Sequence, residues 1–250
     1  MSFSRWHALG NTYLLAERAE LGGPLTPERV REACDGRADG VLEVLSADGD
    51  SAEIVIWNPD GSTAELSGNG TRIAERWLAE RTGAQDVRIR VGEREVHARM
   101  LGGADVETSL GTVEVGEIET LDLGSELVEL TPVSVGNPHA VIRREPERRE
   151  LLRIGPLIEN HARFPERTNV QLIRVDGLHD LTVAVWERGA GETRASGTSA
   201  VAAAAAAVAN GWSESPITVH MPGGDLRVTL DAENRATLVG PAERSDPGAA

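Results

Sequence analysis

The sequence predicts an α+β protein with two pseudo-symmetric domains, each a mostly antiparallel sheet around a central helix. The first observation is a repeated frame, in which Ser67-Gly68 and Ser196-Gly197 each follow a tryptophan at the same spacing. The second is that each serine precedes an alanine-containing run, which ends at a glycine and leads into a predicted β-hairpin. Both copies therefore indicate strand, loop, helix and hairpin in the same order, which predicts an internal duplication.

The duplication extends towards the beginning of each half. Gly10-Asn11-Thr12-Tyr13 corresponds to Gly136-Asn137-Pro138-His139, at nearly the same offset as the two serines. We expect domains at residues 1–117 and 118–240, followed by a disordered tail at 241–250. A chain of 250 residues with 40% hydrophobic residues is long enough to form two such cores.

The first half is expected to begin with extended segments and an early helix. Extended structure over 3–17 is broken at Gly10-Asn11, and Thr26 caps a helix that has Pro27 at its first position and continues to Cys34. The further expected elements are strands over 41–45 and 52–57, a helix over 69–81, and a hairpin of strands 87–91 and 95–100.

The second half is expected to repeat the last part of this order. The alanine run after Ser196 ends at Gly211 and is expected to form a helix. Strands are then expected over 217–221 and 225–230, joined by a turn at Pro222-Gly223-Gly224. Both halves therefore place a hairpin directly after the helix of the repeated frame.

Each of the two serines is expected to stand at the beginning of a helix. The first N–H groups of a helix have no intrahelical acceptor, and the helix dipole adds partial positive charge there. Such a helix end binds anions, and two of them that face each other could hold one carboxylate. The alternative interpretation is that Ser67 and Ser196 are ordinary N-caps, a position that serine often fills. The duplicated frame favours a functional role.

Composition excludes several classes of function. A net charge of −15 argues against nucleic acid and anionic membranes as partners. The chain has no lysine, since all 25 basic residues are arginine, and this excludes enzymes that bind pyridoxal phosphate or a substrate through a lysine imine. The one cysteine, Cys34, excludes an internal disulfide, a multi-cysteine zinc site and a two-thiol mechanism. Without a long apolar stretch or a signal-peptide pattern, the expected location is the cytoplasm.

Six short motifs occur in order along the chain. They are Gly10-Asn11, Asn58 to Ser62, Gly68 to Arg72, Gly136 to His139, Pro165 to Val170, and Glu187 to Thr193 leading to Gly197-Thr198. Together they resemble the diaminopimelate epimerase family, a group of cofactor-independent amino-acid epimerases and racemases. The resemblance covers nearly the whole chain. It implies the two-domain fold of that family and an isomerase that interconverts LL- and meso-diaminopimelate, a precursor of lysine and peptidoglycan, by α-proton transfer. It implies an amino-acid substrate, no metal or organic cofactor, and a homodimer.

The resemblance also implies catalytic residues. In that family two cysteines stand on opposite sides of the substrate α-carbon and move its proton, and here those positions hold Ser67 and Ser196. A serine hydroxyl is less acidic than a thiol by roughly five pKa units, or about 7 kcal/mol. A serine that acts as a base therefore needs a separate proton acceptor. The residues that match the family's histidine and glutamate beside the reacting centre are His139 and Glu187.

The binding residues are likewise implied by the resemblance. Backbone N–H groups of Gly68, Asn69, Gly197 and Thr198 would hold the α-carboxylate. The far end of the amino acid would be bound by Asn11, Asn58, Asn137, Asn169 and Arg188, with Arg188 gripping the distal carboxylate through its forked guanidinium. Without the resemblance, asparagines in loops are interpreted as turn formers. The short segment Cys34–Gly40 and Ser199 depart from the family pattern.

Several alternatives to a diaminopimelate epimerase remain open. One is an amino-acid dehydratase or another lyase, or an epimerase of a different amino acid, on the same fold. Another is a catalytically inactive amino-acid-binding homologue. The last is an active enzyme whose two cysteines were replaced by serine through engineering.

Overall fold

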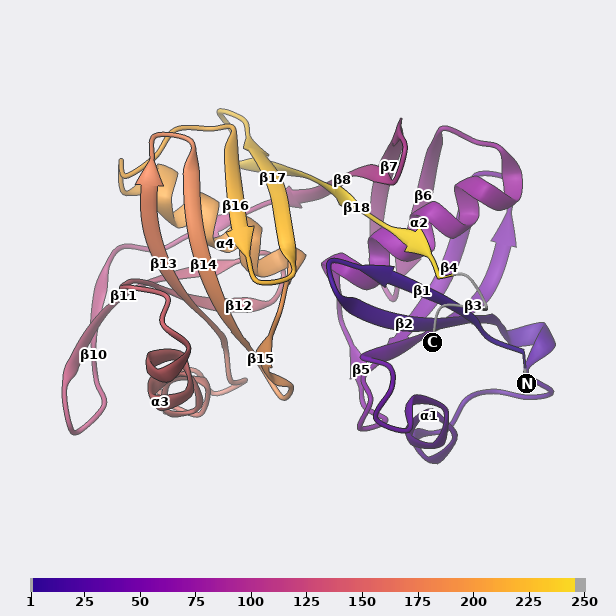
Figure 1. Ribbon diagram of the computed structural model, residues 1–250, viewed down its shortest axis with the longest axis horizontal. Helices are drawn as coiled ribbons and strands as arrows, with labels where there is room; N and C mark the ends of the chain where they lie inside the picture. The colour runs from indigo at the N-terminus through magenta and orange to yellow at the C-terminus, as the bar shows by residue number, and fades with distance from the viewer. Residues whose placement is uncertain (1, 246–250) are drawn as a thin grey trace. The chain divides into compact units, whose positions relative to one another are not determined.

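The computed structural model describes residues 2–245, and the chain forms two compact units (Figure 1). Unit 1 contains the chain up to Ser109 and the segment from Val239 onwards, and unit 2 contains Leu110–Leu238. The division falls within two strands, β8 (Asp105–Thr112) and β18 (Arg235–Pro241). The boundary predicted from the sequence lies at 117/118, and that prediction does not assign the last strand to the first domain.

Unit 1 is a mixed sheet with two helices, and neighbouring strands follow the order β19-β1-β2-β3-β4-β6-β7-β8. The β2–β3 and β4–β6 pairs are parallel and the other pairs are antiparallel. Parallel neighbours need a crossover connection, which α1 and α2 provide. Besides β8 and β18, its elements are β1 (Ser4–Ala8), β2 (Asn11–Glu17), η1 (Arg18–Glu20), α1 (Pro27–Cys34), β3 (Gly40–Asp48), β4 (Ser51–Trp57), β5 (Thr63–Ala64), α2 (Gly68–Thr82), β6 (Asp86–Val91), β7 (Arg94–Gly102) and β19 (Glu243–Arg244).

Unit 2 repeats this arrangement, with the strand order β10-β11-β12-β13-β14-β16-β17. Its parallel pairs are β12–β13 and β14–β16, which correspond to the two parallel pairs of unit 1. The predicted α+β class and the predicted duplication are thus confirmed. The elements are β9 (Glu114–Val115), β10 (Glu119–Asp122), β11 (Leu127–Ser134), β12 (Pro138–Arg143), α3 (Arg148–Glu159), β13 (Asn169–Gly177), β14 (Asp180–Glu187), β15 (Gly191–Thr193), α4 (Gly197–Ala209), β16 (Ile217–Met221) and β17 (Gly224–Leu230).

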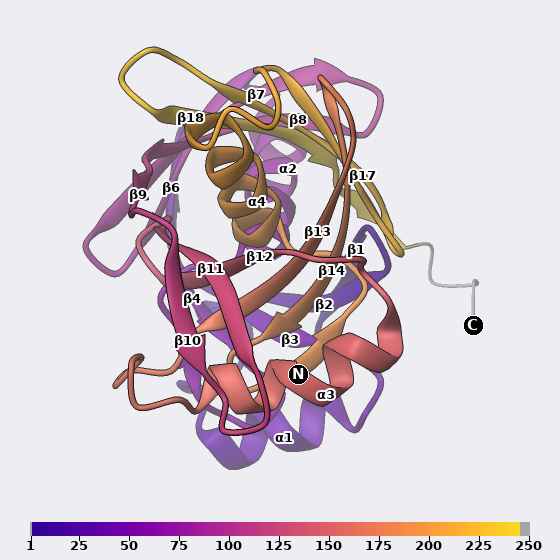
Figure 2. The same cartoon turned by 90° about the vertical axis from the view of Figure 1, so that its left-hand side faces the viewer.

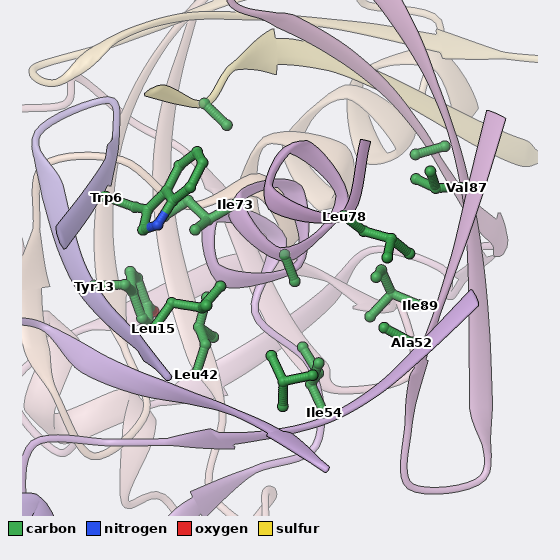
Figure 3. Packing of buried hydrophobic residues seen from close by; sticks show 14 of the residues in the cluster. Trp6, Tyr13, Leu15, Leu42, Ala52, Ile54, Ile73, Leu78, Val87 and Ile89 are labelled. Atoms are coloured by element: carbon green, nitrogen blue, oxygen red, sulfur yellow. The ribbon is translucent and has the colours of Figure 1, made fainter. Parts of the chain in front are cut away.

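The sheet of unit 1 buries apolar side chains on both of its faces. Successive strand residues point to opposite faces, so Leu42 of β3 packs towards α2 while Val41 packs towards α1. Figure 3 shows the larger cluster gathered around α2, with Trp6, Tyr13, Leu15, Leu42, Ala52, Ile54, Ile73, Leu78, Val87 and Ile89 labelled. Burial on both faces holds α1 and α2 against opposite sides of the same strands.

Unit 2 encloses its central helix α4 within its curved sheet, as Figure 2 shows with α4 seen along its axis. Residues Ala200–Ala207 of α4 are all buried. A helix that is apolar on every side must be covered on every side, and alanine lets the strands approach it closely. On the other face of the sheet, α3 buries Leu151, Ile154 and Ile158.

Two features of the structure differ from the sequence prediction. The helix α3 was not predicted, because Pro156 lies inside it and a proline normally interrupts a helical pattern. The expected disordered tail is ordered at its beginning, since Glu243–Arg244 forms β19 and pairs with β1. The part of the expected tail at 246–250 lies outside the described residues.

The close packing of α3 on unit 2 leads to a stability prediction. A Cβ added to Gly155 would lie 2.8 Å from Cγ of Trp186. We expect Gly155→Ala to destabilise the protein by about 1–3 kcal/mol through overpacking, although the same change in an exposed helix is stabilising. Urea unfolding measures the difference. The control is Gly177→Ala, where the nearest atom, Oδ2 of Asp180, would be 4.0 Å from the new Cβ, and which should be nearly neutral. Equal stability of both variants would contradict the prediction.

Candidate functional site

The first half-site lies at the N-terminus of α2, where Ser67 is the N-cap residue. Its Oγ accepts a hydrogen bond of 3.1 Å from the N–H of Gly70, so Ser67 does make the capping contact that the structural interpretation predicted. The next residues, Gly68 and Asn69, are buried in the first turn of the helix. This helix end has the N–H groups and the dipole direction of an anion site.

A tyrosine hydroxyl lies beside Ser67. The Oη atom of Tyr13 is 3.0 Å from Ser67 Oγ, and either oxygen can be the donor. Tyr13 pairs with Gly40 across β2 and β3, and a Cβ on Gly40 would lie 2.7 Å from Cε1 of Tyr13. The glycine therefore leaves the space that the tyrosine ring occupies. Sequence reasoning missed Tyr13 as a site residue, although the duplication aligned it with His139.

A buried arginine donates hydrogen bonds to the first turn of α2. Arg72 is fully buried and donates to the carbonyl oxygen of Gly68 at 3.1 Å and to Oδ1 of Asn69. Burial lowers the pKa of Arg72 to about 10, against the opposing effect of negative charge at Glu75 and Tyr13. Arg72 therefore stays cationic at neutral pH and fixes the side chain of Asn69.

The carboxyl group that interacts electrostatically with Arg72 is that of Glu75, one turn further along α2. Burial raises the pKa of Glu75 to about 7, and this is opposed by the hydroxyl of Thr108, which donates to Oε2 at 2.6 Å, and by the charge of Arg72. Among the described residues, the other oxygen of Glu75, the Oγ1 of Thr71 and the Nε of Arg72 have no hydrogen-bond partner. The cluster is thus a buried polar group inside an otherwise apolar core.

The two asparagines predicted in unit 1 have different surroundings. Asn11 is buried at the beginning of β2 and lies on the same face of the strand as Tyr13. Asn58 donates from its side chain to Oγ of Ser62 at 2.9 Å, and its N–H donates to the carbonyl oxygen of Ser62. The structure therefore gives Asn58 the turn-forming contacts that are usual for an asparagine in a loop.

The second half-site lies at the N-terminus of α4, where Ser196 occupies the same place as Ser67. Ser196 is buried and extended in backbone conformation, and within the described residues its side chain makes no capping hydrogen bond. Gly197 and Thr198 form the buried first turn of α4. The two serines therefore occupy equivalent positions but make different contacts.

His139 is buried in unit 2 and both of its ring nitrogens have partners. The amide Nε2 of Gln171 donates to Nδ1 at 3.0 Å, so Nε2 of His139 carries the proton and donates to Oδ1 of Asn137 at 2.9 Å. Burial lowers the pKa of His139 to about 3, and the charge of Arg188 acts in the same direction. The imidazole is therefore neutral at physiological pH. Gln171 also donates to Oγ of Ser199 in α4, which links His139 to that helix.

The loop that carries Glu187 and Arg188 is fixed on both sides. The carboxylate of Glu159 accepts from Nε1 of Trp186 at 2.6 Å and from the N–H of Gly189 at 2.8 Å. Arg167 donates to the same carboxylate at 3.1 Å. Glu159 is 5% exposed, so these contacts are shielded from water. A single buried carboxylate thus holds the residues on either side of Glu187-Arg188.

Asn169 connects this loop to the strand of His139. Its Oδ1 accepts from the backbone N–H of Arg188 at 2.9 Å, and its Nδ2 donates to the carbonyl oxygen of Pro138 at 2.9 Å. The guanidinium of Arg188 donates to the carbonyl oxygen of Glu166 at 3.2 Å. Unit 2 therefore brings together four residues named from the sequence motifs, Asn137, His139, Asn169 and Arg188. Gln171 and Glu159 belong to the same network and were not predicted from the sequence.

The residues that the structure describes, 2–245, include no group of three or more His, Cys, Asp or Glu side chains placed to hold a metal ion. Over the same range, none of the helices combines the length and the apolar composition required to cross a membrane.

Two solved structures share this architecture. A predicted epimerase from Pseudomonas aeruginosa superposes with a TM-score of 0.74 at 17% identity, covering 98% of this chain and 96% of that one. A probable proline racemase from Agrobacterium radiobacter superposes with a TM-score of 0.73 at 16% identity, covering 99% and 93%. At these identities the likeness shows the fold alone.

Sequence similarity is more specific. The family model described as diaminopimelate epimerase matches residues 131–245. Diaminopimelate epimerase of Synechococcus elongatus is 37% identical over 269 residues, covering 97% of this chain and 95% of that protein. The diaminopimelate epimerase of Synechocystis is 35% identical over 275 residues, covering 100% and 99%. The chain belongs to the diaminopimelate epimerase family, as the sequence motifs predicted.

The Glu159 contacts predict how the loop of Arg188 can be loosened. Glu159→Gln replaces one acceptor oxygen with an amide that cannot accept, so the N–H of Gly189 or of the Trp186 indole loses its partner. We expect faster hydrogen exchange at the Gly189 amide and a loss of stability of about 1–3 kcal/mol. The matched control is Glu43→Gln in unit 1, where a buried glutamate accepts from Nε1 of Trp57 and from Arg18. Glu43→Gln should leave exchange at Gly189 unchanged. Unaltered exchange in Glu159→Gln would show that the carboxylate does not hold the loop.

The buried carboxyl of Glu75 predicts a pH dependence of stability. Its pKa is raised on folding, so the folded protein binds more protons than the unfolded chain between the two pKa values, and stability falls as pH rises through about 7. Glu75→Gln removes this contribution. Relative to wild type, the variant should gain stability between pH 5 and pH 8, by at most about 3 kcal/mol. Thermal unfolding of both proteins across this range measures the difference, and parallel pH profiles would refute the prediction.

Proposed function

We propose that this chain interconverts LL- and meso-diaminopimelate by moving the α-proton, with Ser67 and Ser196 as the two proton-transfer residues. The observation that carries the proposal is full-length similarity to proteins named diaminopimelate epimerase, at 37% and 35% identity. The repeated half-site supports it, because each serine stands at the N-terminus of the helix that its unit encloses. We also propose, from family membership alone, a homodimer that acts in the cytoplasm.

The α-carboxylate of the substrate is the anion that the two helix ends suit. Backbone N–H groups at Gly68 and Asn69, and at Gly197 and Thr198, would donate to its oxygens. These residues are buried in the first turns of their helices, where hydrogen bonds to a charged group are stronger than in water. Holding the α-carboxylate also draws electron density away from the α-carbon, which favours loss of its proton.

The distal end of the substrate carries a second carboxylate and an amine. Arg188 would bind the carboxylate with its forked guanidinium, and Asn169 supports this by fixing the backbone of Arg188. The side-chain oxygens and amides of Asn11, Asn58 and Asn137 would bind the remaining polar groups. Asn58 and Asn137 must then share their amides with the contacts to Ser62 and His139.

Proton transfer by serine needs an acceptor for the hydroxyl proton. Of the two groups that the family motifs suggested, His139 is neutral, and the Gln171 amide already occupies the lone pair of its Nδ1. Glu187 stands in the loop fixed by Glu159 and supplies a carboxylate for this role. We therefore propose Glu187 as an acid or base and His139 as a neutral residue that orients Asn137.

A second candidate function is amino-acid binding without turnover. The observation that favours it is the capping contact of Ser67, because accepting from the N–H of Gly70 is what a purely structural serine does at this position. Such a protein would keep the anion sites at both helix ends and the guanidinium of Arg188. It would bind diaminopimelate and leave the α-proton in place.

The test is α-proton exchange in deuterated water, followed by NMR with LL- and meso-diaminopimelate. The wild-type protein should exchange the α-protons of both isomers and convert each into the other. The variant Ser67→Cys/Ser196→Cys is run in parallel, because thiols ionise far more readily than hydroxyls. Exchange by the cysteine variant alone, together with substrate binding by the wild type, would establish the binding protein instead. Failure of both proteins to exchange or bind diaminopimelate would exclude this substrate.

A further inference from the structure

The hydrogen bonds around Ser67 form an ordered chain that ends at a phenol. The N–H of Gly70 donates to Ser67 Oγ at 3.1 Å, which uses this oxygen as an acceptor. The hydroxyl proton of Ser67 can then be donated onwards to Oη of Tyr13, 3.0 Å away. The N–H of Gly70, the hydroxyl of Ser67 and the hydroxyl of Tyr13 therefore follow one another in a hydrogen-bonded chain. One proton can move along the short path between the two hydroxyls.

The position of the phenol is tightly determined by packing. Tyr13 is 8% exposed and its ring belongs to the apolar cluster around α2 (Figure 3). Opposite the ring, Gly40 has no Cβ, and any Cβ there would also lie 2.5 Å from the carbonyl oxygen of Trp57. The neighbouring Thr12 is tied to Asp39 through its N–H at 2.7 Å, and Asp39 donates its own N–H to the carbonyl oxygen of Thr12. The phenol oxygen is thus presented to Ser67 in one place.

Burial disfavours the ionised form of the phenol, and the positive charge near it acts in the opposite direction. Arg72 is a fully buried cation in the first turns of α2, and Tyr13 is one of the two groups whose negative charge stabilises it. A buried cation is costly unless an anion is near, and the same interaction lowers the cost of a phenolate. The positive end of the helix dipole at Ser67 acts in the same direction.

We propose that Tyr13 is the proton acceptor and donor for Ser67 in the proposed α-proton transfer, on which this inference rests. When Ser67 removes the α-proton, the Cα–H bond breaks and its electron pair stays on the α-carbon. The proton forms a new bond to Ser67 Oγ, and the original hydroxyl proton passes to the Tyr13 phenolate. When Ser67 returns a proton to the α-carbanion, the neutral phenol resupplies Ser67 and becomes the phenolate. Neither direction needs a further reactant.

The phenol is much more acidic than a serine hydroxyl, so it can supply the acidity that is lost where serine stands in place of a thiol. An ordinary tyrosine has a pKa of about 10, whereas a serine hydroxyl is roughly five units less acidic than a thiol at about 8.5. Proton transfer is most efficient when a group of suitable acidity takes the proton away. Tyr13 lies within hydrogen-bond distance of Ser67, and this is the contact that such an acceptor requires.

The internal duplication supports a chemical role at this position. Tyr13 corresponds to His139, so in both halves a residue able to carry a proton stands two positions after Asn11 or Asn137. In unit 2 both ring nitrogens of His139 are engaged by Gln171 and Asn137. In unit 1 the equivalent residue contacts the serine itself.

The first test is Tyr13→Phe, which removes one oxygen and keeps the ring. The exchange rate in deuterated water should fall by about 10²–10⁴-fold, while KM for diaminopimelate changes little. The same substitution is made in Ser67→Cys, because a thiol ionises without help from the phenol. If Tyr13 serves only as packing, Tyr13→Phe will slow both backgrounds equally. If it serves Ser67, the loss will be confined to the serine background.

The second test uses the fact that Tyr13 is the one tyrosine in the chain. Growth on 3-fluorotyrosine therefore places the more acidic phenol at a single site without any substitution. The basic limb of the pH–rate profile should move to lower pH, in step with the Tyr13 ionisation followed by ultraviolet difference absorbance. This measurement also covers the case in which Tyr13→Phe fails to fold.

The outcomes separate this inference from the proposed function. Exchange by wild type with an undiminished rate in Tyr13→Phe, or an unshifted pH profile with 3-fluorotyrosine, would overturn the role of Tyr13 and leave the epimerase proposal standing. No exchange by wild type would overturn both. Loss of exchange in Tyr13→Phe that Ser67→Cys restores, with the shifted profile, would establish the role.

Discussion

The burial of one helix against the curved sheet of each unit determines where the proposed binding chemistry can occur. Because α2 and α4 are covered by strands, their first turns are fixed to the sheet and cannot be rearranged without exposing the core. The N–H groups at these ends have no acceptor within the helix and must be used by something else. Ser67 and Ser196 stand at these two points, so the residues implied in α-carboxylate binding are positioned by packing as much as by chemistry.

The helix α2 buries two charged side chains, Arg72 and Glu75, whereas α4 buries apolar side chains at the corresponding positions. The positions in α4 that correspond to Arg72 and Glu75 are Val201 and Ala204, and both are fully buried. The fold is therefore compatible with apolar residues at these places, and a buried charged pair stabilises a core poorly compared with them. What Arg72 adds is contact with Gly68 and Asn69 and a positive charge near Tyr13. Its presence in unit 1 is explained by the half-site rather than by packing.

Local signals allowed the sequence to predict some elements accurately, and interactions distant in sequence limited the rest. Thr26 and Pro27 mark the beginning of α1 because capping depends on neighbouring residues alone. The hairpins are predicted by the alternation of apolar and polar residues and by glycine turns. The helix α3 was not predicted, because Pro156 interrupts its helical pattern. Tyr13 in an apolar strand has the pattern of a core residue. Its contact with Ser67 depends on the strand pairing that brings Gly40 opposite it and on the register of α2, which the spacing of motifs does not contain.

The contacts of the two serines also make the half-sites unequal as proton-transfer groups. Ser67 Oγ accepts from a helix N–H and lies beside a phenol, and a hydrogen bond donated to an oxygen favours its negatively charged form. Ser196 has neither of these contacts among the described residues, and its burial disfavours a charged oxygen. In the proposed reaction Ser67 would therefore be the better base, and Ser196 would be better suited to donate its hydroxyl proton to a carbanion. Two thiols would have similar acidity, whereas the proposed reaction of two serines would depend on a different set of supporting residues in each direction.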